Sequence, residues 1–217
     1  WIVLILIPLL VLMFYQISRH YARASTLAAS FTPLRSEELH HIIIVPIASL
    51  NVPAMQGIAF GRSITPNVIA VHIVGENDDT GPLREQWMTY ISSRRERWAN
   101  EAQLRAAELG DRPGATYEIE AIKRGPQLVK INSPYRALVS PLVAYVRSVR
   151  DLNPQATVTV VLPEFVPAHF WEGLLHNQSA FRLKLALYRE PRVIVVNIPY
   201  HLAGAGETVT PTPESVG

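Results

Sequence analysis

Short apolar runs alternate with helical patterns in the second half of the chain, and this alternation predicts the fold. Residues 157–162 (TVTVVL) and 192–198 (RVIVVNI) are rich in β-branched residues, and the prolines Pro163 and Pro199 are expected to end them. Apolar residues recur at helical intervals between the two runs. They are Phe170, Leu174, Phe181, Leu185 and Tyr188. Two strands that are apolar on both faces and joined by a helix predict a parallel sheet covered on both sides.

Three further strands are predicted nearer the N-terminus. They are residues 40–48 (HHIIIVPIA), 67–75 (NVIAVHIVG) and 127–131 (QLVKI). His72, in the second of them, is expected to be a core histidine with its hydrogen bonds satisfied rather than a ligand. Together the pattern gives five strands and four helices in strict alternation, which predicts a doubly wound α/β domain. We place this domain at residues 37–202.

A helix is predicted directly after the first strand. Asn51 has the side chain of an N-cap, and Pro53 falls in the first turn, where a missing N–H does no harm. Gly57 and Gly61 are spaced to let this helix lie close to the sheet. The buried face is expected to consist of Met55, Ile58 and Ala59.

The segment between the second and third strands is harder to interpret. Residues 80–110 are highly charged but carry an apolar stripe, which consists of Leu83, Trp87 and Ile91. Residues 111–126 are interpreted as an inserted surface loop or small hairpin, because Thr116–Ile122 alternates in polarity. In the helix expected after the third strand, Pro141 either introduces a kink or occupies the first turn behind Ser140, and the sequence leaves both possibilities open.

The first fifteen residues (WIVLILIPLLVLMFY) contain no charge. This run is shorter than the roughly 20 residues that span a bilayer. The chain starts at Trp1 rather than Met, so we interpret residues 1–15 as the truncated end of a longer membrane helix in contact with lipid. Arg19 and Arg23 follow this run, and the positive-inside rule then places the next region on the cytoplasmic side. The protein is therefore expected in the cell membrane with its α/β domain in the cytoplasm.

These patterns divide the chain into four parts. Residues 1–23 form the end of the membrane helix with its extension, and residues 24–36 form a linker. The α/β domain follows, and residues 203–217 are expected to be disordered because they contain Gly, Thr, Pro and Glu without an apolar pattern.

Composition excludes several classes of function. The 20 Lys and Arg residues nearly balance 18 Asp and Glu residues, so we expect no nucleic-acid partner. The absence of cysteine excludes disulfides, thiolate catalysis and cysteine-based zinc sites. Adjacent His40 and His41 would point to opposite faces of a strand and could not bind one metal ion. Common nucleotide-binding and hydrolase motifs are also missing. We therefore expect no enzyme, although Glu164, Glu172 and His169 could in principle perform acid–base chemistry.

One polar cluster, His176-Asn177-Gln178-Ser179, interrupts the apolar stripe of the last crossover helix. Asn177 or Ser179 could simply cap the helix while its neighbours satisfy backbone groups. Alternatively, the cluster marks a helix N-terminus at the carboxyl ends of the strands, where doubly wound sheets bind ligands and amide groups favour anions.

Three strings support a resemblance to a known family: SPYRALVSPLVAYV, VTVVLPEFVPAHFWEGLLHNQSAFRLKLAL and VIVVNIPYHL. The chain resembles the cytosolic C-terminal domain of bacterial amino acid permease-like transporters of the amino acid-polyamine-organocation superfamily, some of which look like proton-coupled potassium importers. That resemblance implies a universal stress protein-like fold with strand order 3-2-1-4-5. It also implies attachment to the transporter's membrane domain, a homodimer and a regulatory rather than catalytic role.

The resemblance also suggests a ligand. Potassium importers of this branch are implied to respond to cyclic di-AMP through this domain. The positions expected to bind it are Arg136, His176, Asn177, Gln178 and Ser179. The alternative is a membrane-anchored stress protein-like module that binds ATP, but the glycines that wrap a triphosphate in such proteins are missing after the fourth strand.

Overall fold

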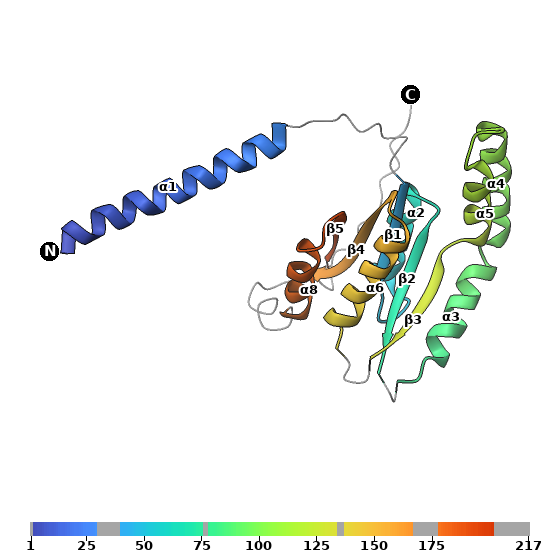
Figure 1. Cartoon of the computed structure of the whole chain (residues 1–217). Helices are drawn as coiled ribbons and strands as arrows, with labels where there is room; N and C mark the ends of the chain where they lie inside the picture. Colours follow the sequence, from blue (N-terminus) through green and yellow to red (C-terminus); the bar gives the residue numbers. More distant parts are fainter. Residues whose placement is uncertain (1, 30–39, 76–77, 134–136, 167–177, 202–217) are drawn as a thin grey trace, which may run out of the picture. The chain divides into compact units, whose positions relative to one another are not determined.

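The computed structural model describes residues 2–29, 40–75, 78–133, 137–166 and 178–201 (Figure 1). The chain divides into two compact units at the boundary between Leu39 and His40.

The described part of the first unit is helix α1 (Ile2–Ala29), whose apolar side chains from Val3 to Tyr15 are exposed. This helix ends inside the segment expected to be a linker. Within the described residues, no helix combines the length and hydropathy needed to cross a membrane. The interpretation of residues 1–15 as the end of a longer membrane helix stays a prediction.

The second unit contains a five-stranded sheet in which every neighbouring pair is parallel. The strand order is β3-β2-β1-β4-β5, so the predicted fold class and order are confirmed. The strands are β1 (His40–Pro46), β2 (Val68–Val74), β3 (Gln127–Asn132), β4 (Ala156–Val166) and β5 (Val193–His201).

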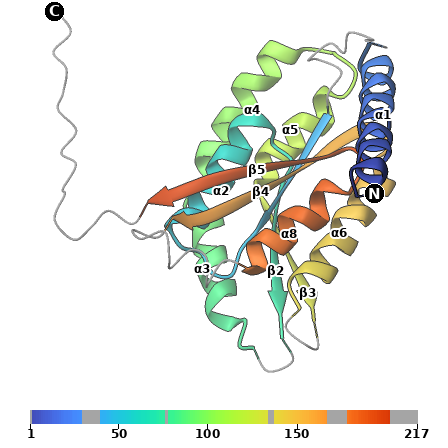
Figure 2. The ribbon, with the colours of Figure 1, turned by 90° about the vertical axis from the view of Figure 1, so that its left-hand side faces the viewer.

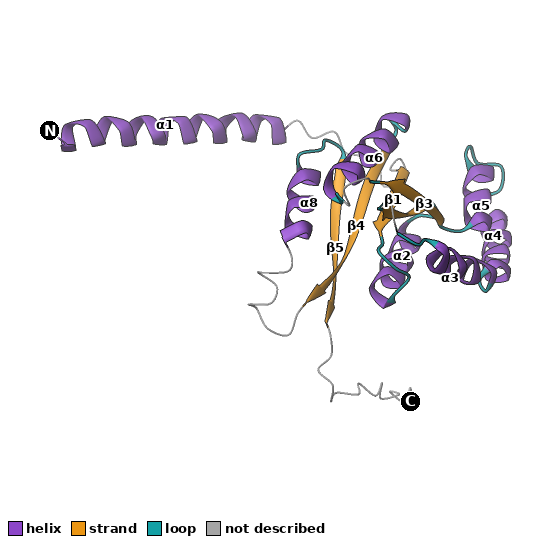
Figure 3. Cartoon of the chain, turned by 90° about the horizontal axis from the view of Figure 1, so that it is seen from below, coloured by secondary structure: helices purple, strands orange, loops and turns teal. Residues whose placement is uncertain are grey.

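Helices cover both faces of this sheet, as expected for apolar parallel strands. Helices α6 (Val139–Leu152) and α8 (Gln178–Tyr188) lie side by side on one face (Figure 2), and α2 (Val52–Ile64) lies on the other (Figure 3). Each face has its own buried cluster. Ile43 and Val45 pack under α2, whereas Ile44 and Val160 pack under α6 and α8.

The predicted start of α2 is confirmed. The Asn51 side chain accepts a hydrogen bond from the Ala54 N–H at 3.0 Å. A Cβ added at Gly57 would lie 3.0 Å from a Val45 methyl carbon, and one at Gly61 would lie 3.0 Å from an Ile43 methyl carbon. The two glycines therefore allow the helix to approach the sheet.

Other details of the predicted helix faces need correction. In α2, Ile58 is buried as predicted, but Met55 is half-buried and Ala59 is exposed. The reason is that the side of the helix that carries the two glycines lies against the sheet.

In α6, Pro141 lies in the first turn, so a kink at this proline is excluded. Leu138 rather than Ser140 occupies the N-cap position.

Pro163 and Pro199 do not end their strands, contrary to prediction. β4 continues to Val166 and β5 continues to His201, with Glu164 opposite Pro199. The paired register between β1 and β4 ends at Val160 of β4, so Pro163 lies where β5 is the remaining partner. β5 is an edge strand. A proline without an N–H is tolerated at positions where no ladder hydrogen bond is lost.

Part of the apolar stripe predicted for the last crossover helix lies on the solvent side of α8, whereas Phe170 and Leu174 lie outside the described residues. Phe181, Leu185 and Tyr188 are 67%, 45% and 66% exposed, whereas Leu183 and Leu187 are buried against the sheet. Two apolar stripes run along α8, and helical periodicity does not tell which of them meets the core.

Three helices, α3 (Gly81–Ser92), α4 (Arg95–Leu109) and α5 (Ala115–Arg124), connect β2 to β3. The strict alternation of strands and helices is therefore wrong here, and the predicted loop or hairpin at residues 111–126 is mostly helix α5. The apolar positions in α5 also fit a helix, because Ala115, Ile119 and Ile122 share one face.

An ion-pair cluster ties α6 to the turn before β5. The Glu190 carboxylate, which is 6% exposed, accepts hydrogen bonds from Arg147 at 2.5 Å and from Arg150 at 3.1 Å. The hydrogen bond from Arg147 is the largest influence, and it lowers the pKa of Glu190 below its ordinary value. Protonation of this carboxylate therefore opposes folding.

This arrangement predicts an acid-dependent loss of stability. Because the folded pKa lies below the unfolded one, the contribution of Glu190 is complete above the unfolded pKa and disappears as the pH falls through the folded pKa. We expect Glu190→Gln to lower the free energy of unfolding at neutral pH and to flatten its decrease on acidification. Denaturant unfolding from neutral pH down to about pH 3 measures this. Parallel pH profiles for the two proteins would show that the cluster does not contribute.

Candidate functional site

The structure leaves the predicted ligand-binding residues untested. Arg136, His176 and Asn177 lie outside the described residues. Gln178 and Ser179 are the first two residues of α8, but their side chains are outside the described part of the structure. The proposed role of these five residues in ligand binding therefore stays a prediction.

A pocket of about 480 Å³ lies where β2 and β3 reach the carboxyl edge of the sheet. Ligands of open α/β sheets bind at this edge, because the loops that follow the strands gather there. The lining residues come from the ends of the two strands and from the segment before α3. They are Val74, Gly75, Asp78, Thr80, Lys130, Asn132 and Ser133.

Hydrogen bonds hold the wall of this pocket that follows β2. The Asp78 carboxylate accepts from the Gly75 N–H at 2.8 Å, and the Asp78 N–H donates to the Gly75 carbonyl at 3.2 Å. On the wall formed by β3, the Ser133 N–H donates to the Val74 carbonyl at 2.8 Å. Ser133 is buried, and its hydroxyl donates to the Ala137 carbonyl at 3.1 Å. These bonds fix the end of β3 just before the segment that contains Arg136.

Lys130 supplies the positive charge of the pocket. Its ammonium group donates to the Thr80 hydroxyl at 2.7 Å, which holds it across the gap between β3 and the start of α3. The lining also offers the Asn132 amide. An ammonium group beside hydroxyl and amide groups can bind the anionic part of a polar ligand, and the Asp78 carboxylate of the same lining balances its charge. The sequence interpretation missed Lys130 and Thr80, which are 50 positions apart in the chain and meet only through the fold.

The family model described as the KimA potassium transporter C-terminal domain matches residues 39–93 and 119–200, which is more than half of the chain. The chain belongs to this family. Residues 94–118 lie between the two matched parts, and they include α4 and the start of α5. The resemblance to transporters of the amino acid-polyamine-organocation superfamily is thereby confirmed.

Two individual proteins are similar to this KimA-family domain. It is 27% identical over 203 residues to the potassium transporter KimA of Bacillus subtilis (strain 168), covering 93% of this chain and 28% of the transporter. The chain thus spans less than a third of that relative. A crystal structure of a universal stress protein family member from Burkholderia pseudomallei is similar over 76% of this chain and all of that chain, with 16% identity and a TM-score of 0.34.

Of the three residues considered for acid–base chemistry, the structure describes only Glu164. Glu164 forms an ion pair with Lys184 of α8 at 2.5 Å, and His169 and Glu172 lie outside the described residues. His72 is partly buried, and its Nδ1 lies 3.0 Å from the Ile47 carbonyl oxygen, as expected for a core histidine. Among the residues that the structure describes, no three acidic or histidine side chains are placed to hold a metal ion.

Proposed function

We propose that this chain is the cytosolic regulatory domain of a potassium transporter, and that it pairs with a second copy and senses a nucleotide. Its membership of the KimA C-terminal domain family carries the proposal. Because the Bacillus subtilis relative is more than three times longer than the matched part, the remaining length would supply the membrane domain. The transporter would lie in the cell membrane, with this domain in the cytoplasm.

Cyclic di-AMP is the ligand we favour, bound at the carboxyl edge of the sheet. Lys130 supplies a cation there, and Arg136 follows Ser133, the last described lining residue, by three positions. Together the two cations would suit the two phosphates of a cyclic dinucleotide. The ligand would regulate transport by binding one conformation of the transporter better than another, and its effect would be limited by that difference in affinity.

ATP is the alternative ligand, with less support from the chain. A glycine-rich phosphate loop would begin where the fourth strand was expected to end, at Pro163, but Pro163, Glu164 and Val166 all belong to β4. Backbone held in a β ladder does not curl around phosphates as glycine-rich loops do. We therefore expect ATP to bind more weakly than cyclic di-AMP.

Two cations of the chain provide a test with a control. Lys130 lines the pocket at the carboxyl edge, whereas Arg112 is exposed between α4 and α5 and lies outside that lining. We expect Lys130→Ala to weaken cyclic di-AMP binding by about tenfold, as for a lost charge-assisted hydrogen bond. Arg136→Ala should have a similar effect, and Arg112→Ala should leave the affinity within about twofold. Isothermal titration calorimetry measures all three variants. Equal affinities for Lys130→Ala and Arg112→Ala would place the nucleotide elsewhere.

A further inference from the structure

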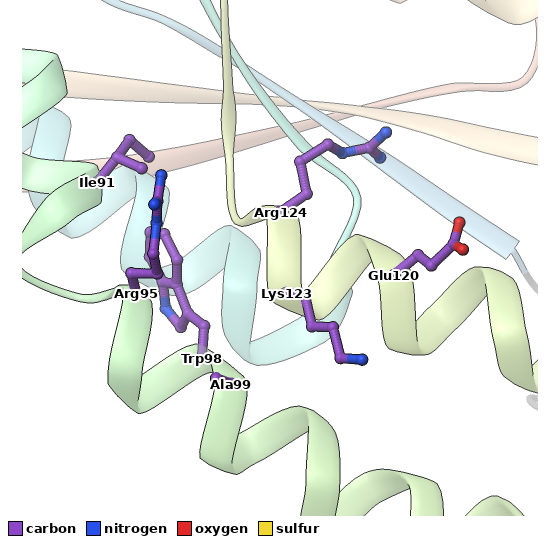
Figure 4. A pocket seen from close by; sticks show the side chains of 7 residues that line it. All are labelled: Ile91, Arg95, Trp98, Ala99, Glu120, Lys123 and Arg124. Carbon is purple, nitrogen blue, oxygen red and sulfur yellow. The ribbon is translucent and has the colours of Figure 1, made fainter.

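A second pocket lies among the helices α3, α4 and α5, which connect β2 to β3 (Figure 4). It measures about 570 Å³, within the range of roughly 300–1,000 Å³ typical of ligand sites. Arg95 and Trp98 come from α4, and Lys123 and Arg124 come from the last turn of α5, directly before β3. The complete lining is Ile91, Arg95, Trp98, Ala99, Glu120, Lys123 and Arg124.

The two walls of this pocket differ in their relation to the family. The wall from α5 lies in a segment that the family model matches, whereas Arg95, Trp98 and Ala99 lie in residues 94–118, which it does not match. The pocket therefore depends on helix α4 as well as on α5. Its lining contains no residue of the sheet.

The charge of the lining is unbalanced. Three cations, Arg95, Lys123 and Arg124, stand against one carboxylate, Glu120, which leaves an excess of two positive charges. Within the part of the chain that the structure describes, none of the three cations forms an ion pair. Arg105 of the same helical hairpin does, because it binds Glu118 at 2.9 Å and Glu108 at 2.8 Å. Arg95 and Lys123 are thus available to an anion, whereas the Arg124 guanidinium donates to the side-chain oxygen of Gln127 at 3.1 Å.

The base of the pocket is aromatic and firmly packed. Trp98 is 4% exposed and meets Tyr90 edge to face, with ring centroids 6.1 Å apart. The Arg62 guanidinium lies over the Trp98 ring, 4.8 Å from its centroid. The same guanidinium forms an ion pair with Glu101 at 3.1 Å, which holds it in place over the ring. Ile91 and Ala99 complete an apolar wall.

We propose that this pocket binds an organic phosphate, with the phosphate between Arg95 and Lys123 and the apolar part against Ile91 and Ala99. A phosphate monoester carries about −1.5 to −2 charges at neutral pH, which matches the excess of two positive charges in the lining. Guanidinium groups bind phosphate oxygens in a bidentate manner, and two of the three cations are arginines. The phosphate could belong to a free nucleotide or to the headgroup of an anionic lipid.

Calorimetric titration of the full chain in a non-ionic detergent tests the proposal and distinguishes the two sources. The probes are adenosine monophosphate and the short-chain lipid dihexanoyl phosphatidic acid, both phosphate monoesters, with adenosine and dihexanoyl phosphatidylcholine as controls that lack a net charge. We expect one charged probe to bind, and the double variant Arg95→Ala/Lys123→Ala to weaken it by at least about tenfold. Arg112→Ala removes one exposed charge near the loop between α4 and α5, outside the lining, and should change the affinity less than about twofold.

A second variant tests the cavity without removing charge. Ala99→Phe would place an aromatic ring in the apolar wall and should also abolish binding. Lys130→Ala, at the carboxyl edge, should leave this binding unchanged, so failure here is distinguishable from failure of the nucleotide site proposed above. The proposal is overturned if neither charged probe binds, or if the double variant or Ala99→Phe binds as tightly as the unaltered chain.

Discussion

Replacing Gly125 with alanine is expected to lower the free energy of unfolding by about 3–5 kcal/mol. Gly125 ends α5 with φ +72° and ψ −171°, a backbone conformation that is essentially restricted to glycine. A Cβ at this position would lie 2.2 Å from the Cζ3 atom of Trp98. The indole cannot easily move away, because it is packed against Tyr90 and beneath Arg62. Backbone strain and overpacking therefore add together, and denaturant unfolding measures their sum.

Gly114 provides the matched control. It precedes α5 with φ +87°, but a Cβ added there meets no atom within 4 Å. Gly114→Ala should therefore show the conformational cost alone, about 1 kcal/mol. If the two substitutions destabilise the protein equally, Trp98 does not pack against Gly125 as described.

Replacing Leu187 with alanine is expected to cost about 2–4 kcal/mol of stability. Leu187 lies on the buried side of α8 and is fully buried, in the same cluster as Leu142 and Val160. Removing most of its side chain loses apolar burial and leaves a cavity that the neighbouring residues fill only partly. The free energy of unfolding, from denaturant titration followed by far-ultraviolet circular dichroism, measures the loss.

Leu185 on the same helix is the control, because the substitution is chemically identical and the side chain is 45% exposed. We expect Leu185→Ala to cost less than about 1 kcal/mol. The opposite ranking would mean that the stripe of Phe181, Leu185 and Tyr188 faces the core, as the sequence pattern suggested.

The sheet was predictable because its signal is local. Apolar runs such as Ile42–Val45 and Val158–Leu162 are buried on both faces, and this burial marks central parallel strands without any knowledge of their partners. The start of α2 was predictable for the same reason, since Asn51 caps a helix that begins at the next residue. The strand order came from the family resemblance, because the local patterns contain no information on which strands are neighbours.

The errors arose where the outcome depends on distant parts of the chain. Whether Leu185 or Leu187 of α8 is buried depends on how the helix rotates against the sheet. Pro163 continues β4 because β1 no longer pairs with it at that point. The short polar alternation at Thr116–Ile122 fits a strand as well as a helix, and packing against α4 decides in favour of the helix.

The candidate site shows the same limit. Lys130 and Thr80 form one side of the pocket at the carboxyl edge, although the three helices α3, α4 and α5 separate them in the sequence. No spacing rule links such residues. The residues that the sequence did single out, Arg136 and His176 to Ser179, were chosen from polarity and family resemblance, and their role in ligand binding remains to be measured.

The most direct test of the proposed function is calorimetric titration of the unaltered chain with cyclic di-AMP and, in parallel, with ATP. We predict saturable binding of cyclic di-AMP in the micromolar range or tighter, and binding of ATP that is at least about tenfold weaker. Absence of binding by both nucleotides would contradict the proposal that this domain of the KimA family senses a nucleotide.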